Sequence, residues 1–102
     1  MGLFNIFKSD KTDNVSQYLE KGAVVIDVRT VAEYNDGHVE GSKNIVLDTI
    51  QNHIDEIRAF GKPVITCCRS GARSGNAANI LKAHDIDCIN GGPWQNVAKH
   101  IA

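Results

Sequence analysis

One segment in the middle of the chain runs from an apolar strand pattern through a short polar loop into a helix pattern. It reads Pro63-Val64-Ile65-Thr66-Cys67-Cys68-Arg69-Ser70-Gly71-Ala72-Arg73-Ser74. The β-branched run at residues 63–67 is typical of a strand covered on both faces, and proline is tolerated at its first position. Ala77, Ala78 and Leu81 then recur at helical spacing. The segment predicts a strand, a tight loop and a helix in direct succession.

The sequence on both sides of this unit continues the alternation of strands and helices. Further strands are predicted at residues 23–28, 44–46 and 87–90, and helices at 15–20, 32–35, 47–60 and 94–101. Asp13 or Asn14 is expected to cap the first of these helices and Asp48 the third, while residues 91–93 are expected to form a turn. The pattern predicts an α/β fold with a mainly parallel central sheet, flanked by helices on both faces.

The length and the charge of the chain limit its function. With 102 residues it is expected to form a single domain over residues 1–102, in which residues 1–12 are an N-terminal extension, either packed or flexible. Lys and Arg total 11 against 12 Asp and Glu, so there is no overall positive charge to bind nucleic acid. The acidic residues leave a gap between Glu56 and Asp85, and we expect the cations of this gap to concentrate around Cys68.

The apolar stretches and the cysteines indicate a compartment. The patch of Leu3, Phe4, Ile6 and Phe7 is too short for a signal peptide or a membrane span. Packing on the domain, contact with a partner and contact with a membrane surface are all open to it, and we expect the first. Three cysteines, without a Cys-x-x-Cys pair, favour free thiols over a disulfide framework. We therefore expect a cytoplasmic protein without stable membrane association. A monomer is expected as well, although no sequence feature specifies the oligomeric state.

Cys68 has the surroundings of a reactive thiol. It ends a strand at the carboxyl edge of the predicted sheet, where ligands of open α/β folds bind, and a helix begins just after it. Loop N–H groups, the helix dipole and the charges of Arg69 and Arg73 would all lower its pKa. Gly71 permits the loop to curl back. Cys67, on the opposite face of the strand, and Cys88, which has no basic neighbour, are expected to be structural.

Four blocks of the sequence, in this order, resemble the rhodanese family in its single-domain form. They are residues 25–29 with Glu33 and Tyr34, residues 37–45, residues 68–74 and residues 91–94. The resemblance covers nearly the whole chain from about residue 15 onward. It implies a single rhodanese-like domain with about five strands. Glu40 and Ser42 stand where the family more usually has proline and alanine.

The resemblance implies thiosulfate sulfurtransferase activity. Cys68 would take a sulfane sulfur from a donor such as thiosulfate and pass it, as a persulfide, to cyanide or to a thiol such as glutathione or thioredoxin. The substrate-binding residues implied are Arg69, Ser70, Gly71, Ala72 and Arg73. Asp27, Arg29 and Ser74 would support the loop. No organic cofactor is implied, and the four histidines show no ligand spacing that predicts a metal site.

Two other functions remain open. Counted from Cys67, the segment also reads Cys-x5-Arg-Ser, the loop length of cysteine phosphatases and arsenate-reductase-like enzymes. The family register instead starts at Cys68, and the loop offers no aspartate as leaving-group acid. The second possibility is a persulfide carrier, in which Cys68 holds sulfur for a protein partner and turnover with free thiosulfate is slow.

Overall fold

A computed structural model describes residues 11–101 of the chain, with side chains from residue 14 onward. The elements follow in the order α1 (Lys11–Glu20), β1 (Val24–Asp27), α2 (Val31–Asn35), β2 (Lys43–Asn44), the 3₁₀ helix η2 (Leu47–His53), α3 (Ile54–Ala59), β3 (Val64–Cys68), α4 (Ala72–Ala83), β4 (Cys88–Pro93) and α5 (Trp94–Ala98). The apolar patch between Leu3 and Phe7 and the predicted extension up to residue 10 lie outside the described residues. Residues 11 and 12 belong to α1.

The four strands pair in parallel in the order β2-β1-β3-β4. This confirms the predicted α/β class with a parallel sheet, whereas the prediction of about five strands is wrong. Within residues 11–101 the chain before β1 forms a helix and adds no strand. Residues 91–93, predicted as a turn, instead lengthen β4, where Pro93 pairs with Cys68 after an irregularity in the register.

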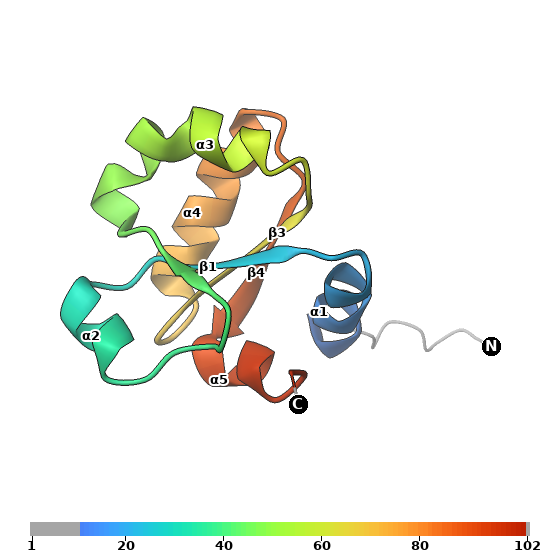
Figure 1. Ribbon diagram of the computed structural model, residues 1–102, viewed down its shortest axis with the longest axis vertical. Helices are drawn as coiled ribbons and strands as arrows, with labels where there is room; N and C mark the ends of the chain where they lie inside the picture. The colour runs from blue at the N-terminus through green and yellow to red at the C-terminus, as the bar shows by residue number, and fades with distance from the viewer. Residues whose placement is uncertain (1–10, 102) are drawn as a thin grey trace.

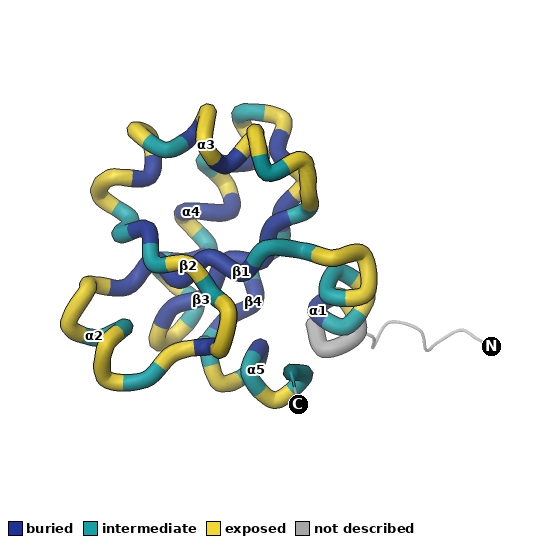
Figure 2. Tube along the Cα trace, viewed as in Figure 1, coloured by how far each residue is buried: buried dark blue, intermediate teal, exposed yellow. Residues whose placement is uncertain are grey.

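Helices cover both faces of the sheet, as predicted, and each face has its own apolar core. Figure 1 shows α3 and α4 on one side of the strands, with α1 and α5 on the other. The first core includes Ile26, Ile57 and Leu81, and the second includes Val25, Ile65 and Val97. Neighbouring strand residues such as Val25 and Ile26 belong to opposite cores because side chains alternate along a strand. The central strands are accordingly buried throughout most of their length (Figure 2).

Helix boundaries differ from the predictions where the pattern fits more than one geometry. The apolar spacing from Leu47 to Ile57 predicted one helix, but the segment forms η2 followed by α3. The helical segment begins at Leu47, so Val46 stands at the N-cap without a capping side chain, and the prediction of Asp48 as the cap is wrong. The predicted caps Asp13 and Asn14 likewise lie inside α1. None of the helices in residues 11–101 is long and apolar enough to cross a membrane.

Candidate active site

The candidate active site lies where β3 passes into α4, at the carboxyl edge of the parallel sheet. Cys68 is the last residue of β3, and α4 begins at Ala72 after a loop of three residues. Cys67 points into the core beneath α1 and α5, and Cys68 points toward the core beneath α4. Only Cys68 therefore shares a face with the loop.

Gly71 turns the loop back over Cys68. Its φ angle of +98° lies in the region that residues with a Cβ rarely adopt. A Cβ at this position would also lie 3.4 Å from the Gly92 Cα atom of β4. In this conformation the Gly71 N–H points at the Cys68 sulfur, with the nitrogen 3.1 Å from Sγ.

Ser74 in the first turn of α4 makes two more contacts with the same sulfur. Its backbone N–H donates to the Cys68 Sγ atom at 3.4 Å, and its Oγ lies 3.2 Å from Sγ. The side chain of Cys68 has no solvent-exposed surface in this arrangement. The loop and the first turn of α4 therefore cover the sulfur.

These contacts lower the pKa of Cys68. Burial acts to raise the pKa of this thiol, but hydrogen bonds from the Ser74 side chain and from the N–H groups of Ser74, Gly71 and Ser70 outweigh it. The sequence also predicts that Arg69 and Arg73 contribute to this lowering of the pKa. Arg69 is exposed and Arg73 is ion-paired with Glu33, so the main causes that lower the pKa of Cys68 are neutral hydrogen-bond donors, to which the charge of Arg73 adds.

Arg73 is bound to Glu33 of α2. Its guanidinium donates to both carboxylate oxygens, at 2.8 and 3.1 Å, and both side chains are about one-third exposed. The Arg73 bond, together with the N–H of Thr30, lowers the pKa of Glu33 to about 2. Glu33 also closes a capping box with Thr30 at the start of α2. The Thr30-x-x-Glu33 spacing could have signalled the cap, but the ion pair joins residues far apart in the sequence.

Asp27 and Arg29 form a buried ion pair at the end of β1. Arg29 donates to both carboxylate oxygens of Asp27 at 2.8–3.0 Å, and its Nη2 also donates to the carbonyl of Gly37 at 2.6 Å. The guanidinium lies 5.2 Å from the ring centroid of Trp94. This pair ties the segment after β1 to the start of α5, beside the loop that follows Cys68.

Asn90 of β4 contacts the loop from the other side and was not singled out from the sequence. Its Nδ2 donates to the Gly71 carbonyl at 3.0 Å, and its Oδ1 accepts from the Ser74 hydroxyl at 2.7 Å. A polar residue directly before Gly91 and Gly92 was the available signal, but the pattern did not indicate which strand would lie beside the loop.

A cavity of about 340 Å³ adjoins the loop at the carboxyl edge of the sheet. Arg69, Arg29 and Trp94 line it, together with the acidic residues Glu33 and Asp36. Among the described cavities, this is the one that Arg69, a predicted substrate-binding residue, lines.

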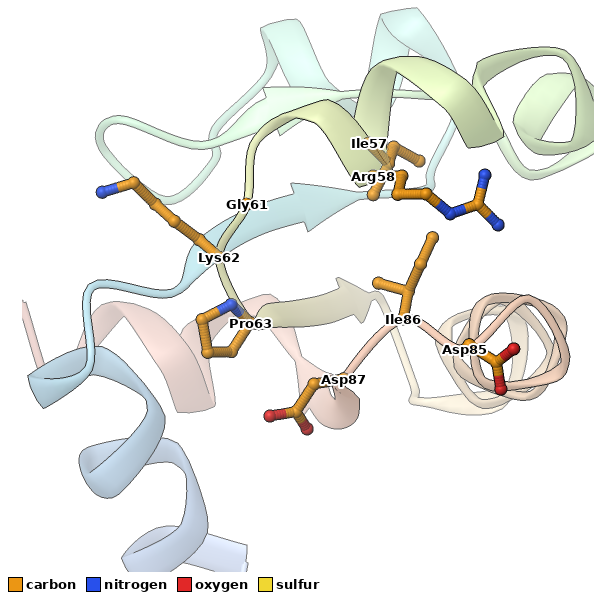
Figure 3. Close-up of a pocket in the computed structure, with 8 residues that line it drawn as sticks. All are labelled: Ile57, Arg58, Gly61, Lys62, Pro63, Asp85, Ile86 and Asp87. Atoms are coloured by element: carbon orange, nitrogen blue, oxygen red, sulfur yellow. The ribbon is translucent and has the colours of Figure 1, made fainter.

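The segment between Glu56 and Asp85 has no acidic residue, and its cations were predicted to lie around Cys68. For the remaining three cations this prediction is wrong. Arg58 and Lys62 line a separate cavity of about 320 Å³ at the amino ends of β3 and β4, with Ile57 and Ile86 facing each other across it (Figure 3). Lys82 lies in the last turn of α4. In a parallel sheet the amino and carboxyl ends of the strands lie on opposite sides of the molecule. Arg58 and Lys62 are therefore near Cys68 in the sequence but at the other end of β3 in the structure.

Cys67 and Cys88 lack the environment of Cys68. Both side chains are buried, and burial is the main cause that raises the pKa of each thiol, in the case of Cys88 to about 12. Asp27 raises the pKa of Cys67 further. A buried thiol that keeps its proton is a poor nucleophile.

Comparison with known proteins identifies a family match and several relatives. The family model described as the rhodanese-like domain matches residues 11–97. The uncharacterized protein YqhL of Bacillus subtilis is 42% identical over 73 residues, which span 69% of this chain and 57% of YqhL. This chain thus spans little more than half the length of that relative.

Two further comparisons cover more of both partners. The thiosulfate sulfurtransferase GlpE of Pseudomonas fluorescens is 34% identical over 91 residues, covering 84% of this chain and 81% of that protein. The crystal structure of a rhodanese-like domain protein from Staphylococcus aureus superposes with a TM-score of 0.66 at 27% identity, covering 85% of this chain and 86% of that one.

Proposed function

Because this chain belongs to the rhodanese-like domain family, which includes sulfurtransferases, we propose that it transfers a sulfane sulfur from thiosulfate or a similar donor through a persulfide on Cys68. The observation that carries the proposal is the set of donors around one sulfur: the Gly71 N–H, the Ser74 N–H and the Ser74 hydroxyl. They stabilise a thiolate, which is the nucleophilic form of cysteine.

The first step forms one S–S bond and breaks another. The Cys68 thiolate attacks the outer sulfur of thiosulfate, the bond between the two thiosulfate sulfurs breaks, and its electron pair leaves with sulfite. Cys68 then carries a persulfide anion. In the second step an acceptor thiolate or cyanide attacks the outer persulfide sulfur, and the Cys68 thiolate departs with the electrons of the broken bond.

Arg69 is the cation best placed to attract the dianionic donor. Among the described residues it has no ion-pair partner, and its side chain lines the cavity beside the loop. Arg73 is engaged by Glu33. We propose that the donor enters through this cavity, meets Arg69 first, and reaches Cys68 as the loop moves aside.

The alternative phosphatase register would make Cys67 the nucleophile. The burial of Cys67 on the opposite face of β3 and the raised pKa of its thiol argue against it. The persulfide-carrier function requires the same Cys68 site, so only the rate of sulfur release separates it from a sulfurtransferase.

Mass spectrometry with two adjacent variants tests the proposal. After thiosulfate treatment, the intact protein should gain one sulfur, about 32 Da, located on Cys68. Cys68→Ser should abolish both this gain and thiocyanate formation from thiosulfate and cyanide. Cys67→Ser is the matched control and should keep most of both.

Each contrary outcome has a distinct meaning. Loss of activity in Cys67→Ser together with retention in Cys68→Ser would refute the proposed nucleophile. A stable persulfide on Cys68 with negligible release to cyanide or glutathione would mean that the protein is a persulfide carrier and not a sulfurtransferase.

We also propose a cytoplasmic location, because all three cysteines are free thiols, which persist in reducing compartments.

A further inference from the structure

The side chain of Asn90 connects three groups that surround Cys68. Its Oδ1 accepts two hydrogen bonds, from the Ser74 hydroxyl at 2.7 Å and from the Gly92 N–H at 2.9 Å. Its Nδ2 donates to the Gly71 carbonyl at 3.0 Å. Ser74 and Gly71 are the two residues whose N–H groups point at the Cys68 sulfur.

The Ser74 hydroxyl has one proton and two neighbours that can accept it. The Asn90 Oδ1 lies 2.7 Å from the Ser74 Oγ, and the Cys68 Sγ lies 3.2 Å from it. An amide oxygen can only accept, whereas a thiol has a proton to donate and is a weak acceptor, and a thiolate only accepts. The direction of the Ser74 hydroxyl therefore depends on the ionisation state of Cys68.

Each ionisation state favours a different hydrogen-bond arrangement. With Cys68 as a thiol, the S–H donates to the Ser74 Oγ and the Ser74 O–H donates to Asn90. With Cys68 as a thiolate, the Ser74 O–H is drawn to the sulfur, because a charged acceptor forms the stronger hydrogen bond. Asn90 Oδ1 then still accepts the Gly92 N–H, so no buried acceptor loses all its partners.

We propose that Asn90 is a positioning residue for Cys68, whose side-chain carbonyl holds the Ser74 hydroxyl proton in the thiol state and yields it to the sulfur when Cys68 ionises. The thiol proton leaves to solvent and Ser74 keeps its own proton, so only the direction of a hydrogen bond changes. Meanwhile the Asn90 amide group holds the Gly71 carbonyl and keeps the loop in place. The inference deepens the proposed function, which requires a Cys68 thiolate.

The charged and titratable groups near Cys68 are bound in other contacts or lie exposed. They are Asp27 and Arg29 from the end of β1, Glu33 from α2, Cys67 from β3, Arg69 from the loop and Arg73 from α4. Within the described residues, none of them forms a hydrogen bond with the Ser74 hydroxyl. Asn90 is the partner that competes with the sulfur for this proton.

A titration of the unmodified protein by NMR tests the proposal directly. When Cys68 ionises, Asn90 Oδ1 loses the Ser74 bond, and its remaining bond to the Gly92 N–H strengthens. The resonance of the Gly92 amide proton should therefore move downfield as the pH rises. The midpoint of this change should equal the pKa of Cys68, which is measured separately from the pH dependence of Cys68 alkylation. In Ser74→Ala, which lacks the hydroxyl, this step should nearly vanish. A constant Gly92 signal, or an equal step in Ser74→Ala, would overturn the proposal.

A double-mutant cycle supplies the second test. Asn90→Asp keeps an acceptor for the Ser74 hydroxyl, but the charged carboxylate accepts that hydrogen bond more strongly than the amide oxygen does. The Cys68 pKa should rise by about one unit, a tenfold loss of thiolate below the pKa. In the Ser74→Ala background the same substitution should shift it by less than half as much. Equal shifts in the two backgrounds would mean that the substitution acts by the charge of the carboxylate or by loss of the Gly71 contact, and not through Ser74, and would overturn the proposal.

These measurements separate the inference from the proposed function. Alkylation and NMR detect Cys68 ionisation in the absence of any sulfur donor. If Cys68 forms no persulfide and the Gly92 step is present, the proposed function fails and the role of Asn90 stands. If Asn90→Asp does not fold, as judged by its melting temperature, the titration of the unmodified protein and Ser74→Ala decides.

Discussion

Replacement of Gly71 by alanine separates the strain of the loop from its role at the sulfur. Gly71 has a φ angle of +98°, and an added Cβ would lie 3.4 Å from the Gly92 Cα atom. Alanine in such a conformation costs on the order of 1–3 kcal/mol. The loop can relieve that cost by rotating the Gly71 peptide, and its N–H then no longer points at Cys68.

The expected effect on Cys68 follows from this one hydrogen bond. A hydrogen bond to a charged group contributes about 1.5–3 kcal/mol, and about 1.4 kcal/mol corresponds to one pKa unit. Loss of the Gly71 N–H contact at 3.1 Å should therefore raise the pKa of Cys68 by about one to two units. Below its pKa, the thiolate fraction should fall about tenfold for each unit.

The pH dependence of iodoacetamide alkylation measures this shift. Gly41→Ala is the matched control, because Gly41 also has a positive φ of +84° but meets no atom within 4 Å of an added Cβ. It should lower the melting temperature and leave the Cys68 pKa unchanged. If Gly71→Ala destabilises the protein like the control but alkylates with an unchanged pH profile, the Gly71 N–H does not stabilise the thiolate.

Three further substitutions probe the surroundings of the site. The folded-state pKa of Cys88, about 12, lies above the 9.0 of an unfolded thiol, so its contribution to stability is complete below pH 9 and is lost as the pH rises toward 12. Cys88→Val should reduce this loss of unfolding free energy at alkaline pH, measured by urea unfolding. An unchanged dependence of the unfolding free energy on pH would contradict this expectation. Glu33→Gln keeps the capping-box spacing but releases the Arg73 cation from its ion pair. Because a free cation attracts a dianion more strongly, the KM for thiosulfate should fall at low salt. A rise in KM would instead mean that the ion pair positions Arg73. Arg29→Lys keeps the charge but loses the two-pronged contact with Asp27, which should cost about 2 kcal/mol of unfolding free energy, and a variant as stable as the parent would refute that role.

Local patterns were sufficient to predict the unit that carries Cys68. The β-branched run before the loop and the alanine and leucine spacing after it are short-range signals, and β3 and α4 lie within a few residues of the predicted bounds. The alternation of side chains along a strand correctly separated the environments of Cys67 and Cys68. Helix 47–60 was less predictable, because a 3₁₀ helix and an α-helix can both bury apolar residues three and four positions apart.

Contacts between distant residues could not be predicted from one sequence. Glu33 and Arg73 are separated by 40 positions, and Asn90 and Gly71 by 19. Whether they meet depends on which strands are neighbours and in what register they pair. The irregularity between β3 and β4 that brings Pro93 beside Cys68 leaves no mark in hydrophobic periodicity.

The Cys-x4-Arg pattern alone suggests that arginine makes the cysteine acidic, but the contacts assign the two tasks to different groups. Neutral donors on Gly71 and Ser74 stabilise the Cys68 thiolate at short range, while Arg69 stays exposed at the cavity. A cation bound to the thiolate would be partly neutralised and would attract a dianion less. Because the hydrogen bonds that most lower the pKa of Cys68 come from neutral groups, Arg69 keeps its charge available for the dianionic donor that we propose. What maintains this separation is the orientation of the Gly71 and Ser74 donors, which depends on Asn90, a residue outside the pattern.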